Sequence, residues 1–287
     1  MKHVYLLAVI IICFCASAGL ATPTPTRFHN EEADTARINK ILVESIASGF
    51  KSAGERTANI AMRFVGTPYV AHTLEGRPEV LTVNLDELDC TTFVETVMAL
   101  SYTVGEGRST WRDFLYNLQR LRYRRGEVNG YASRLHYISD WVIDNTHRGN
   151  FREVTANFPA VAYQVRTIDF MSANRSKYPA LADDSEFERM RSVEIGYRNH
   201  RFPYIKNSDL AKKTTMAELR SGDIVALVTK MKNLDVTHMG IIIKQEGVPY
   251  LLHASSTNGK VELTSVPLAD FMKRNPSLIG IRVFRLE

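Results

Sequence analysis

Cysteine and histidine side chains are the groups in this sequence that could form a nucleophile and its base. Cys90 lies in the stretch L-D-E-L-D-C-T-T-F-V-E-T-V-M-A-L, where an acidic, polar approach leads into an apolar helical pattern. A helix N-terminus favours a thiolate, and a thiolate is a better nucleophile than a thiol. Asp89, the residue before it, could cap this helix. The stretch predicts a reactive cysteine with a lowered pKa, or alternatively a buried cysteine that acts as a small hydrophobic residue.

Two histidines lie at the ends of apolar, strand-like runs. His238 begins the run at 238–243, and His253 ends the run at 250–253. In an antiparallel hairpin the start of one strand lies opposite the end of the next, so the two imidazoles could be adjacent. A helix packed on that face could present Cys90 to them, which would join a nucleophile, a base and an orienting group. The alternatives are two satisfied histidines at a sheet edge, or a zinc site without the usual close ligand pairs.

The elements that must position these groups change character along the chain. The N-terminal part has apolar residues at helical spacing, which predicts helices from about residue 34, over 55–65, after Cys90 and over 111–123. The C-terminal third contains short strand-like runs at 224–228, 238–243, 250–253, 261–263 and 279–284. Helices followed by neighbouring strands predict an α+β fold with an antiparallel sheet. We expect one domain over 34–287, with a helical insertion at roughly 105–215.

The first residues have the layout of a signal peptide. Lys2 is followed by an apolar stretch at 4–15 and then by small residues, so 1–21 are predicted to be removed on export and 22–33 to form a linker. Cleavage after Ala18 or Ala21 would leave Cys90 as the only cysteine, without an intramolecular disulfide partner. Neither a lasting membrane anchor nor a lipid anchor is expected, because the apolar stretch is short and bulky residues precede its cysteines.

Composition and motifs exclude several classes. The 287 residues carry a formal net charge of +5, a mild basicity that suits an exported protein near anionic envelope polymers. The arginine-rich run at 120–125 is interpreted as a solvated helix end, since no nucleic-acid motif accompanies it. The sequence contains neither G-x-S-x-G nor a phosphate-binding glycine loop, and no metal or organic cofactor is expected.

Three short motifs carry a resemblance to a known family. D-C-T-T-F-V at 89–94, H-M-G-I-I-I at 238–243 and L-H-A-S at 252–255 resemble the motifs of NlpC-type cell-wall cysteine peptidases, papain-like enzymes that cleave peptidoglycan peptides. G-T-P-Y at 66–69 and S-G-D at 221–223 resemble two further segments, in the family's order. The resemblance implies a papain-like fold whose nucleophile lies at a helix start packed on an antiparallel sheet.

The resemblance also implies roles for individual residues. Cys90 would be the nucleophile, His238 the general base and His253 the residue that orients His238. Tyr69 and Asp89 would help to shape the site near the thiolate.

The chain departs from the compact family pattern. Cys90 and His238 are 148 positions apart (238 − 90), and D-C-T-T-F replaces the usual D-C-S-G-F/L. Within the added region, residues 130–141 resemble a segment of the branch of N-acetylmuramoyl-L-alanine amidase-like proteins. That resemblance implies substrate contacts by Arg134, His136, Tyr137 and Asp140. The guanidinium of Arg134 could pair with a peptide carboxylate, or these residues could be core and ordinary surface.

Together these features predict an exported peptidoglycan amidase. A Cys-His-His mechanism would hydrolyse the amide between N-acetylmuramic acid and L-Ala, in the polymer or in soluble muropeptides. The alternatives are a γ-D-glutamyl-diamino acid endopeptidase of the same fold, a non-catalytic peptidoglycan-binding module and a thiol acyltransferase. The resemblance favours the periplasm, and otherwise full secretion. No nucleic-acid partner is expected, and the oligomeric state stays open.

Overall fold

The computed structural model describes residues 25–287, and the expected signal peptide lies outside that range. Regular structure begins within residues 22–33, which were expected to form a linker. Strand β1 (Thr26–Phe28) pairs in parallel with β2 (Leu81–Val83). Helix α1 (Glu31–Ala47) begins early because the side chain of Asn30 accepts a hydrogen bond from the Ala33 backbone and so caps the first turn.

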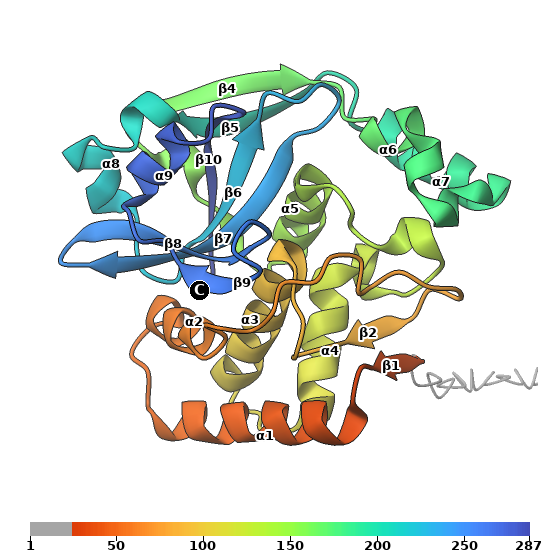
Figure 1. Cartoon of the computed structure of the whole chain (residues 1–287), viewed down its shortest axis with the longest axis horizontal. Helices are drawn as coiled ribbons and strands as arrows, with labels where there is room; N and C mark the ends of the chain where they lie inside the picture. Colours follow the sequence, from red (N-terminus) through yellow and green to blue (C-terminus); the bar gives the residue numbers. More distant parts are fainter. Residues whose placement is uncertain (1–24) are drawn as a thin grey trace, which may run out of the picture.

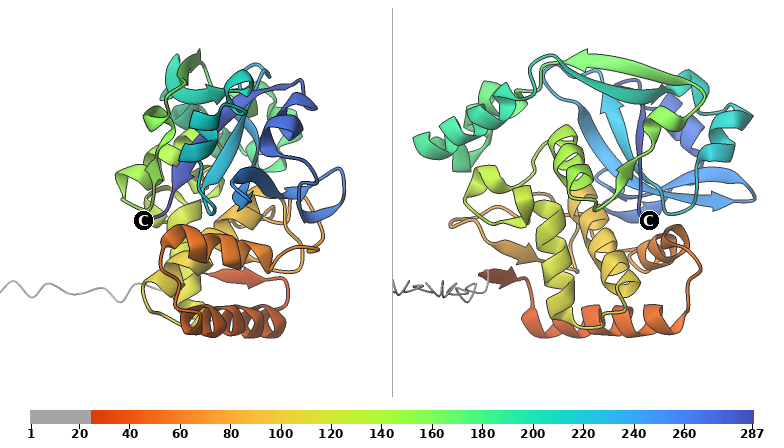
Figure 2. Two further views of the ribbon diagram at one scale, coloured as in Figure 1. Left: turned by 90° about the vertical axis from the view of Figure 1, so that its left-hand side faces the viewer. Right: turned by 180° about the vertical axis from the view of Figure 1, so that it is seen from behind.

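Helices make up most of the first half of the described chain. The α-helices are α1, α2 (Ala53–Met62), α3 (Cys90–Gly105), α4 (Trp111–Arg122), α5 (Ile138–His147), α6 (Phe170–Ala173), α7 (Asp184–Ile195), α8 (Lys213–Glu218) and α9 (Leu268–Lys273). Short 3₁₀ helices are η1 (Arg124–Gly126), η2 (Tyr131–Ser133), η3 (Thr155–Asn157), η4 (Arg175–Lys177), η5 (Pro179–Ala182) and η6 (Asn207–Asp209). Figures 1 and 2 show α1 to α4 grouped on one side of the sheet, where α2 and α3 contact β7, and α6 and α7 projecting beyond the ends of β4 and β5.

The main sheet has eight strands and antiparallel pairing. Its strands are β3 (Arg152–Glu153), β4 (Val161–Arg166), β5 (His200–Lys206), β6 (Ile224–Thr229), β7 (Val236–Gln245), β8 (Val248–Ser255), β9 (Lys260–Leu263) and β10 (Leu278–Arg285). Their order is β4-β5-β10-β6-β7-β8-β9, and β3 also pairs with β10. The predicted α+β class with an antiparallel sheet is therefore confirmed.

The segment expected to be a helical insertion is mixed. It contains α4 to α7, but β4 and β5 form an antiparallel pair that extends the sheet beyond β10. Partly buried and exposed residues alternate along β4 from Ala162 onward, as on a sheet with one open face, whereas β5 buries Phe202, Tyr204 and Ile205. Neither strand has the continuous apolar run that marked the later strands in the sequence.

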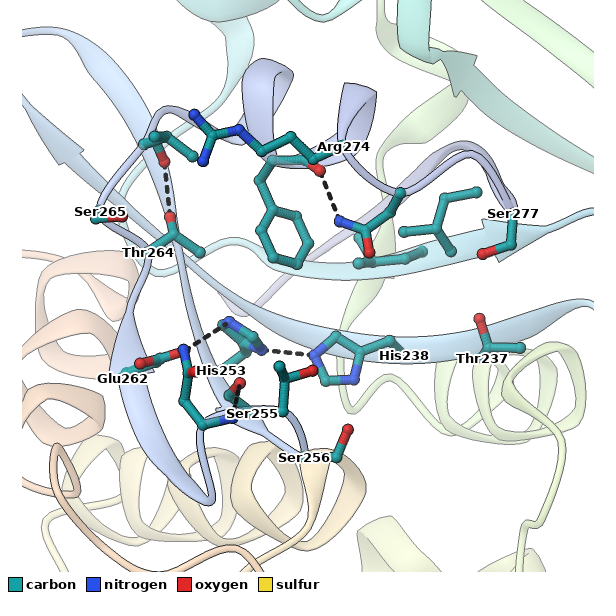
Figure 3. A pocket seen from close by; sticks show the side chains of 17 residues that line it. Thr237, His238, His253, Ser255, Ser256, Glu262, Thr264, Ser265, Arg274 and Ser277 are labelled. Carbon is teal, nitrogen blue, oxygen red and sulfur yellow. Dashed lines mark hydrogen bonds and ion pairs between the residues drawn. The ribbon is translucent and has the colours of Figure 1, made fainter.

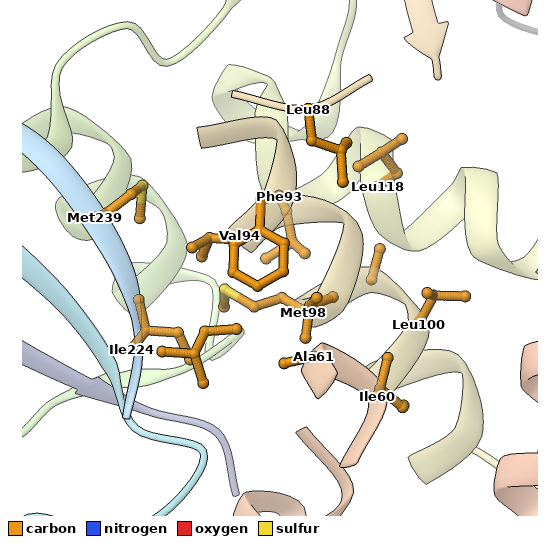
Figure 4. Close-up of a cluster of buried hydrophobic side chains, with 14 of the residues drawn as sticks. Ile60, Ala61, Leu88, Phe93, Val94, Met98, Leu100, Leu118, Ile224 and Met239 are labelled. Atoms are coloured by element: carbon orange, nitrogen blue, oxygen red, sulfur yellow. The ribbon is translucent and has the colours of Figure 1, made fainter. Parts of the chain in front are cut away.

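Helix α3 is the central packing element. Its Phe93, Val94 and Met98 are fully buried, and Figure 4 shows them between α2 and the sheet residues Ile224 and Met239. Burying each of these side chains contributes about 1.5–3 kcal/mol. The first residue of α3 is consequently held against β7.

A glycine turn fixes the start of β6 beside β7. Gly222 has a φ of +88°, and a Cβ there would lie 2.1 Å from the carbonyl oxygen of Gly54. Its backbone N–H donates to the Ile242 carbonyl, and the Ile242 N–H donates back to the Asp223 carbonyl. Only glycine combines this conformation with so close an approach of another backbone.

Candidate active site

The two strand histidines form a hydrogen-bonded pair. His238 on β7 and His253 on β8 approach to 2.8 Å between Nε2 and Nδ1, and their rings are perpendicular with centroids 4.9 Å apart. Gly240 makes room for this arrangement, because a Cβ there would lie 3.0 Å from the Cβ of His253. The adjacency predicted from the hairpin is confirmed.

Cys90 is the first residue of α3, and the helix start around it is well capped. The Thr92 backbone N–H donates to the Asp89 carboxylate at 2.8 Å, and the Asp89 N–H donates to the Thr92 hydroxyl at 2.9 Å. This reciprocal capping box satisfies two backbone donors of the first turn. The predicted cap at Asp89 is confirmed, and Cys90 is half-buried against the main core.

The thiol of Cys90 has a raised pKa, contrary to the expectation from the helix start. Burial raises it to about 12, and the negative charge of Asp89 adds to the increase. Hydrogen bonds from the Met239 backbone and the Thr91 side chain lower it, but by less. Desolvation therefore outweighs the helix N-terminus. The bond from Met239 also places the sulfur beside the residue that follows His238.

The histidine pair is neutral at ordinary pH. Burial lowers the pKa of His238 to about 3 and that of His253 to about 4, while the charge of Glu262 acts in the opposite direction on His253. The contact to His253 uses Nε2 of His238, and within residues 25–287 its Nδ1 has no hydrogen bond. The thiol of Cys90 and the two imidazoles are therefore all neutral in the resting protein.

A cavity of about 450 Å³ opens beside the histidine pair (Figure 3). Its lining is rich in hydroxyl groups and includes Thr237, His238, His253, Ser255, Ser256, Glu262, Thr264, Ser265, Phe271, Arg274 and Ser277, whereas Cys90 lies outside it. Such polar groups could fix the orientation of a polar substrate. Glu262 was not predicted as a site residue from the sequence. The feature that could have indicated it is its pairing position opposite His253 on the next strand.

Tyr69 lies near the cysteine, as expected. Its backbone N–H donates to the Gly259 carbonyl at 2.8 Å, which ties the 66–69 segment to the turn before β9. The pKa of its hydroxyl is raised by burial and then by the charges of Cys90 and Asp89.

Arg134 and His136 have their polar groups engaged within the added region. Arg134 forms ion pairs with Glu75 at 2.9 Å and Glu79 at 3.1 Å. A ring nitrogen of His136 lies 2.9 Å from the Tyr131 carbonyl oxygen. Burial, followed by the charge of Arg134, lowers the pKa of His136 to about 3.

Tyr137 and Asp140 are also bonded inside the protein. The Tyr137 hydroxyl donates to Glu194 at 2.7 Å, and Asp140 accepts two bonds from Arg124 at 2.7 and 2.6 Å. The lining of the cavity includes neither of them, nor Arg134 or His136. Their assignment to substrate binding stays a prediction.

The described residues were compared with the requirements of a metal site and of a membrane-spanning helix. Within 25–287, no group of three or more histidine, cysteine, aspartate or glutamate side chains is arranged to hold a metal ion. In the same range, no helix has both the length and the apolar character that crossing a bilayer requires.

One family model matches most of the chain. The model of the N-acetylmuramoyl-L-alanine amidase-like (AmiA-like) family matches residues 59–281. An N-acetylmuramoyl-L-alanine amidase from Bacteroides uniformis is 36% identical with a TM-score of 0.77, and the match covers 82% of this chain and 99% of that one. No curated protein matches the chain in sequence.

Two further solved structures are similar. A protein from Bacteroides fragilis, whose name suggests a xylanase, is 39% identical with a TM-score of 0.75, over 79% of this chain and 100% of that one. A protein from Legionella pneumophila shares the fold at 22% identity with a TM-score of 0.70, over 89% and 95% of the two chains.

Proposed function

Because the chain belongs to the N-acetylmuramoyl-L-alanine amidase-like family, we propose that it is a papain-like cysteine amidase of the NlpC type. Its substrate is the amide between N-acetylmuramic acid and L-Ala of peptidoglycan stem peptides. The observation that carries the proposal is the 2.8 Å contact between His238 and His253, on the strands against which the capped start of α3 packs. This arrangement supplies a nucleophile, a base and an orienting group.

The reaction proceeds through an acyl-enzyme. The sulfur of Cys90 attacks the lactyl carbonyl carbon while its proton passes to Nδ1 of His238. Backbone N–H groups at the start of α3 stabilise the oxyanion. The imidazolium then protonates the leaving nitrogen of L-Ala, and the C–N bond breaks to give a thioester. Water, deprotonated by His238, attacks the thioester and releases the lactyl carboxylic acid and the thiol.

The cavity supports an amide rather than a glycosidic substrate. Most glycoside hydrolases use two carboxylic acids on either side of the scissile bond. Among the cavity-lining residues of the described chain, Glu262 is the one carboxylate. We place the enzyme outside the cytoplasm, in the periplasm or secreted, because its first residues resemble a signal peptide.

A defined muropeptide tests the proposal. Wild type should release the intact stem peptide and the free sugar acid, identified by mass spectrometry. Cys90→Ala, with unchanged circular dichroism and thermal melting, should release neither. Free L-Ala-γ-D-Glu would instead show an endopeptidase, and equal activity of Cys90→Ala would contradict the cysteine mechanism. Binding without any turnover by wild type would indicate a peptidoglycan-binding module.

A further inference from the structure

We propose that Glu262 is a positioning residue for the histidine pair. Its carboxylate holds His253 in the tautomer whose Nε2 carries the proton, so that Nδ1 accepts a hydrogen bond from His238. The catalytic consequence of this inference rests on the proposed function, whereas the tautomer itself does not.

The sheet register brings the two side chains together. His253 on β8 and Glu262 on β9 are directly opposite in an antiparallel pair. Their Nε2 and Oε1 atoms are 4.0 Å apart, which is ion-pair range rather than a formed hydrogen bond. Figure 3 shows His253 between His238 and Glu262.

Nε2 of His253 is within ion-pair range of a carboxylate, which accepts hydrogen bonds but donates none. The residue is 4% exposed, and Nε2 is buried without a hydrogen-bond partner among the described residues. Leaving a buried donor without an acceptor is destabilising, because the donor has lost its hydrogen bonds to water. The opposing carboxylate is the group to which a small side-chain rotation would bring this N–H.

Neighbouring contacts keep both partners in place. Glu262 Oε1 accepts a hydrogen bond from Asn258 Nδ2 at 2.6 Å, and the Asn258 backbone donates to the Ser255 hydroxyl at 3.1 Å. The ring of Phe271 on α9 packs edge-on to His253 at 5.3 Å, which restricts rotation of the imidazole.

The tautomer decides what His238 can do. With Nδ1 of His253 unprotonated, Nε2–H of His238 is donated and its Nδ1 is left to receive the thiol proton. The opposite tautomer of His253 would place an N–H against Nε2 of His238 and force the proton onto the reactive nitrogen. A comparable error of tautomer in a catalytic triad is very costly to kcat.

The same carboxylate favours the charged intermediate. The charged groups that line the cavity together with the pair are Glu262 on β9 and Arg274, the residue after α9. Burial lowers the pKa of His253 overall, and the negative charge of Glu262 opposes that decrease. When His238 is protonated, the negative charge of Glu262 on the other side of His253 stabilises the imidazolium. No proton has to move to Glu262.

Substitution of Glu262 in the full chain tests the inference at pH 7. In ¹⁵N-labelled wild type, NMR should show His253 protonated at Nε2. In Glu262→Leu, the Nδ1–H tautomer of His253 should become populated. Alkylation of Cys90 by iodoacetamide should then slow about tenfold, the effect of a rise of about one unit in the pKa of the Cys90 thiol. Glu262→Gln retains an acceptor, so it should restore the tautomer but only part of the alkylation rate.

Controls separate this inference from folding and from the proposed function. Glu246→Gln removes an exposed carboxylate at the β7–β8 turn and should behave as wild type. If Glu262→Leu does not fold, Asn258→Ala should give a smaller change in the same direction. An unchanged tautomer and alkylation rate in folded Glu262→Leu would overturn the inference even if wild type hydrolyses muropeptides. A shifted tautomer without any hydrolysis by wild type would overturn only the proposed function.

Discussion

At the scale of single residues, Arg134 is enclosed by acidic groups. Its side chain is 9% exposed and pairs with Glu79, which is 3% exposed, and with the more accessible Glu75. Burial raises the pKa of the Glu79 carboxyl, while the charge of Arg134 opposes that increase. A buried ion pair is balanced only while both partners are present.

Arg134→Met should therefore destabilise the protein. Removing the guanidinium leaves Glu79 buried without its cation, so we expect the free energy of unfolding to fall by about 3 kcal/mol at pH 7. Urea denaturation measures this loss, and the double variant Arg134→Met/Glu79→Leu should recover most of it. A variant with wild-type stability but a raised KM for muropeptides would show a substrate contact instead.

At the scale of one element, the start of α3 combines two opposing effects of Asp89. Its carboxylate caps the helix that carries Cys90, yet its negative charge raises the pKa of the Cys90 thiol. Asparagine caps helices about as well as aspartate but carries no charge. The two effects can therefore be separated by one substitution.

Asp89→Asn should increase the reactivity of Cys90. Loss of the negative charge lowers the thiol pKa, so alkylation at pH 8 should become about three- to tenfold faster. Asp89→Ala should show a similar pKa change together with about 1 kcal/mol lower stability, because the cap is lost. A slower or unchanged rate in Asp89→Asn would contradict this account.

Patterns within one element were the part of the structure that sequence could predict. The apolar stripe of α3 and most of the residues of β6, β7, β8 and β10 are buried, so these elements stand out in the sequence as a helical stripe and as apolar runs. Weak alternation hid β4 and β5. The ion pairs of Arg134, some 59 and 55 positions away, and the register of Glu262 depend on tertiary pairing. The raised pKa of Cys90 depends on burial, which the position at a helix start does not reveal.

At the scale of the whole molecule, several histidines are kept neutral by burial. The pKa values of His136 and His238 are lowered to about 3 and that of His253 to about 4, and that of His200 is also lowered. Below about pH 6.5 the unfolded chain binds protons at these positions while the folded chain does not. Their contribution to stability is complete above that pH and is lost as pH falls toward 4.

His136→Gln should weaken this dependence on pH. At pH 7 the side chain at position 136 is mainly neutral in both wild type and the variant. Between pH 6.5 and 4.5, the unfolding free energy of wild type should fall by about 2 kcal/mol more than that of the variant. Urea titrations at pH 7, 5.5 and 4.5 measure the difference, with the exposed His147→Gln as control. Parallel losses in wild type and His136→Gln would show that His136 is not kept neutral.

The place of β10 in the sheet has a consequence for the timing of assembly. Leu278–Arg285 lies between β5 and β6, and β3 pairs with it as well. A chain that emerges with its N-terminus first carries two unjoined pieces of sheet until residue 285 has followed. Such long-range pairing makes folding slow. A chain that crosses a membrane pore with its N-terminus first would therefore complete this sheet only after its last strand has crossed.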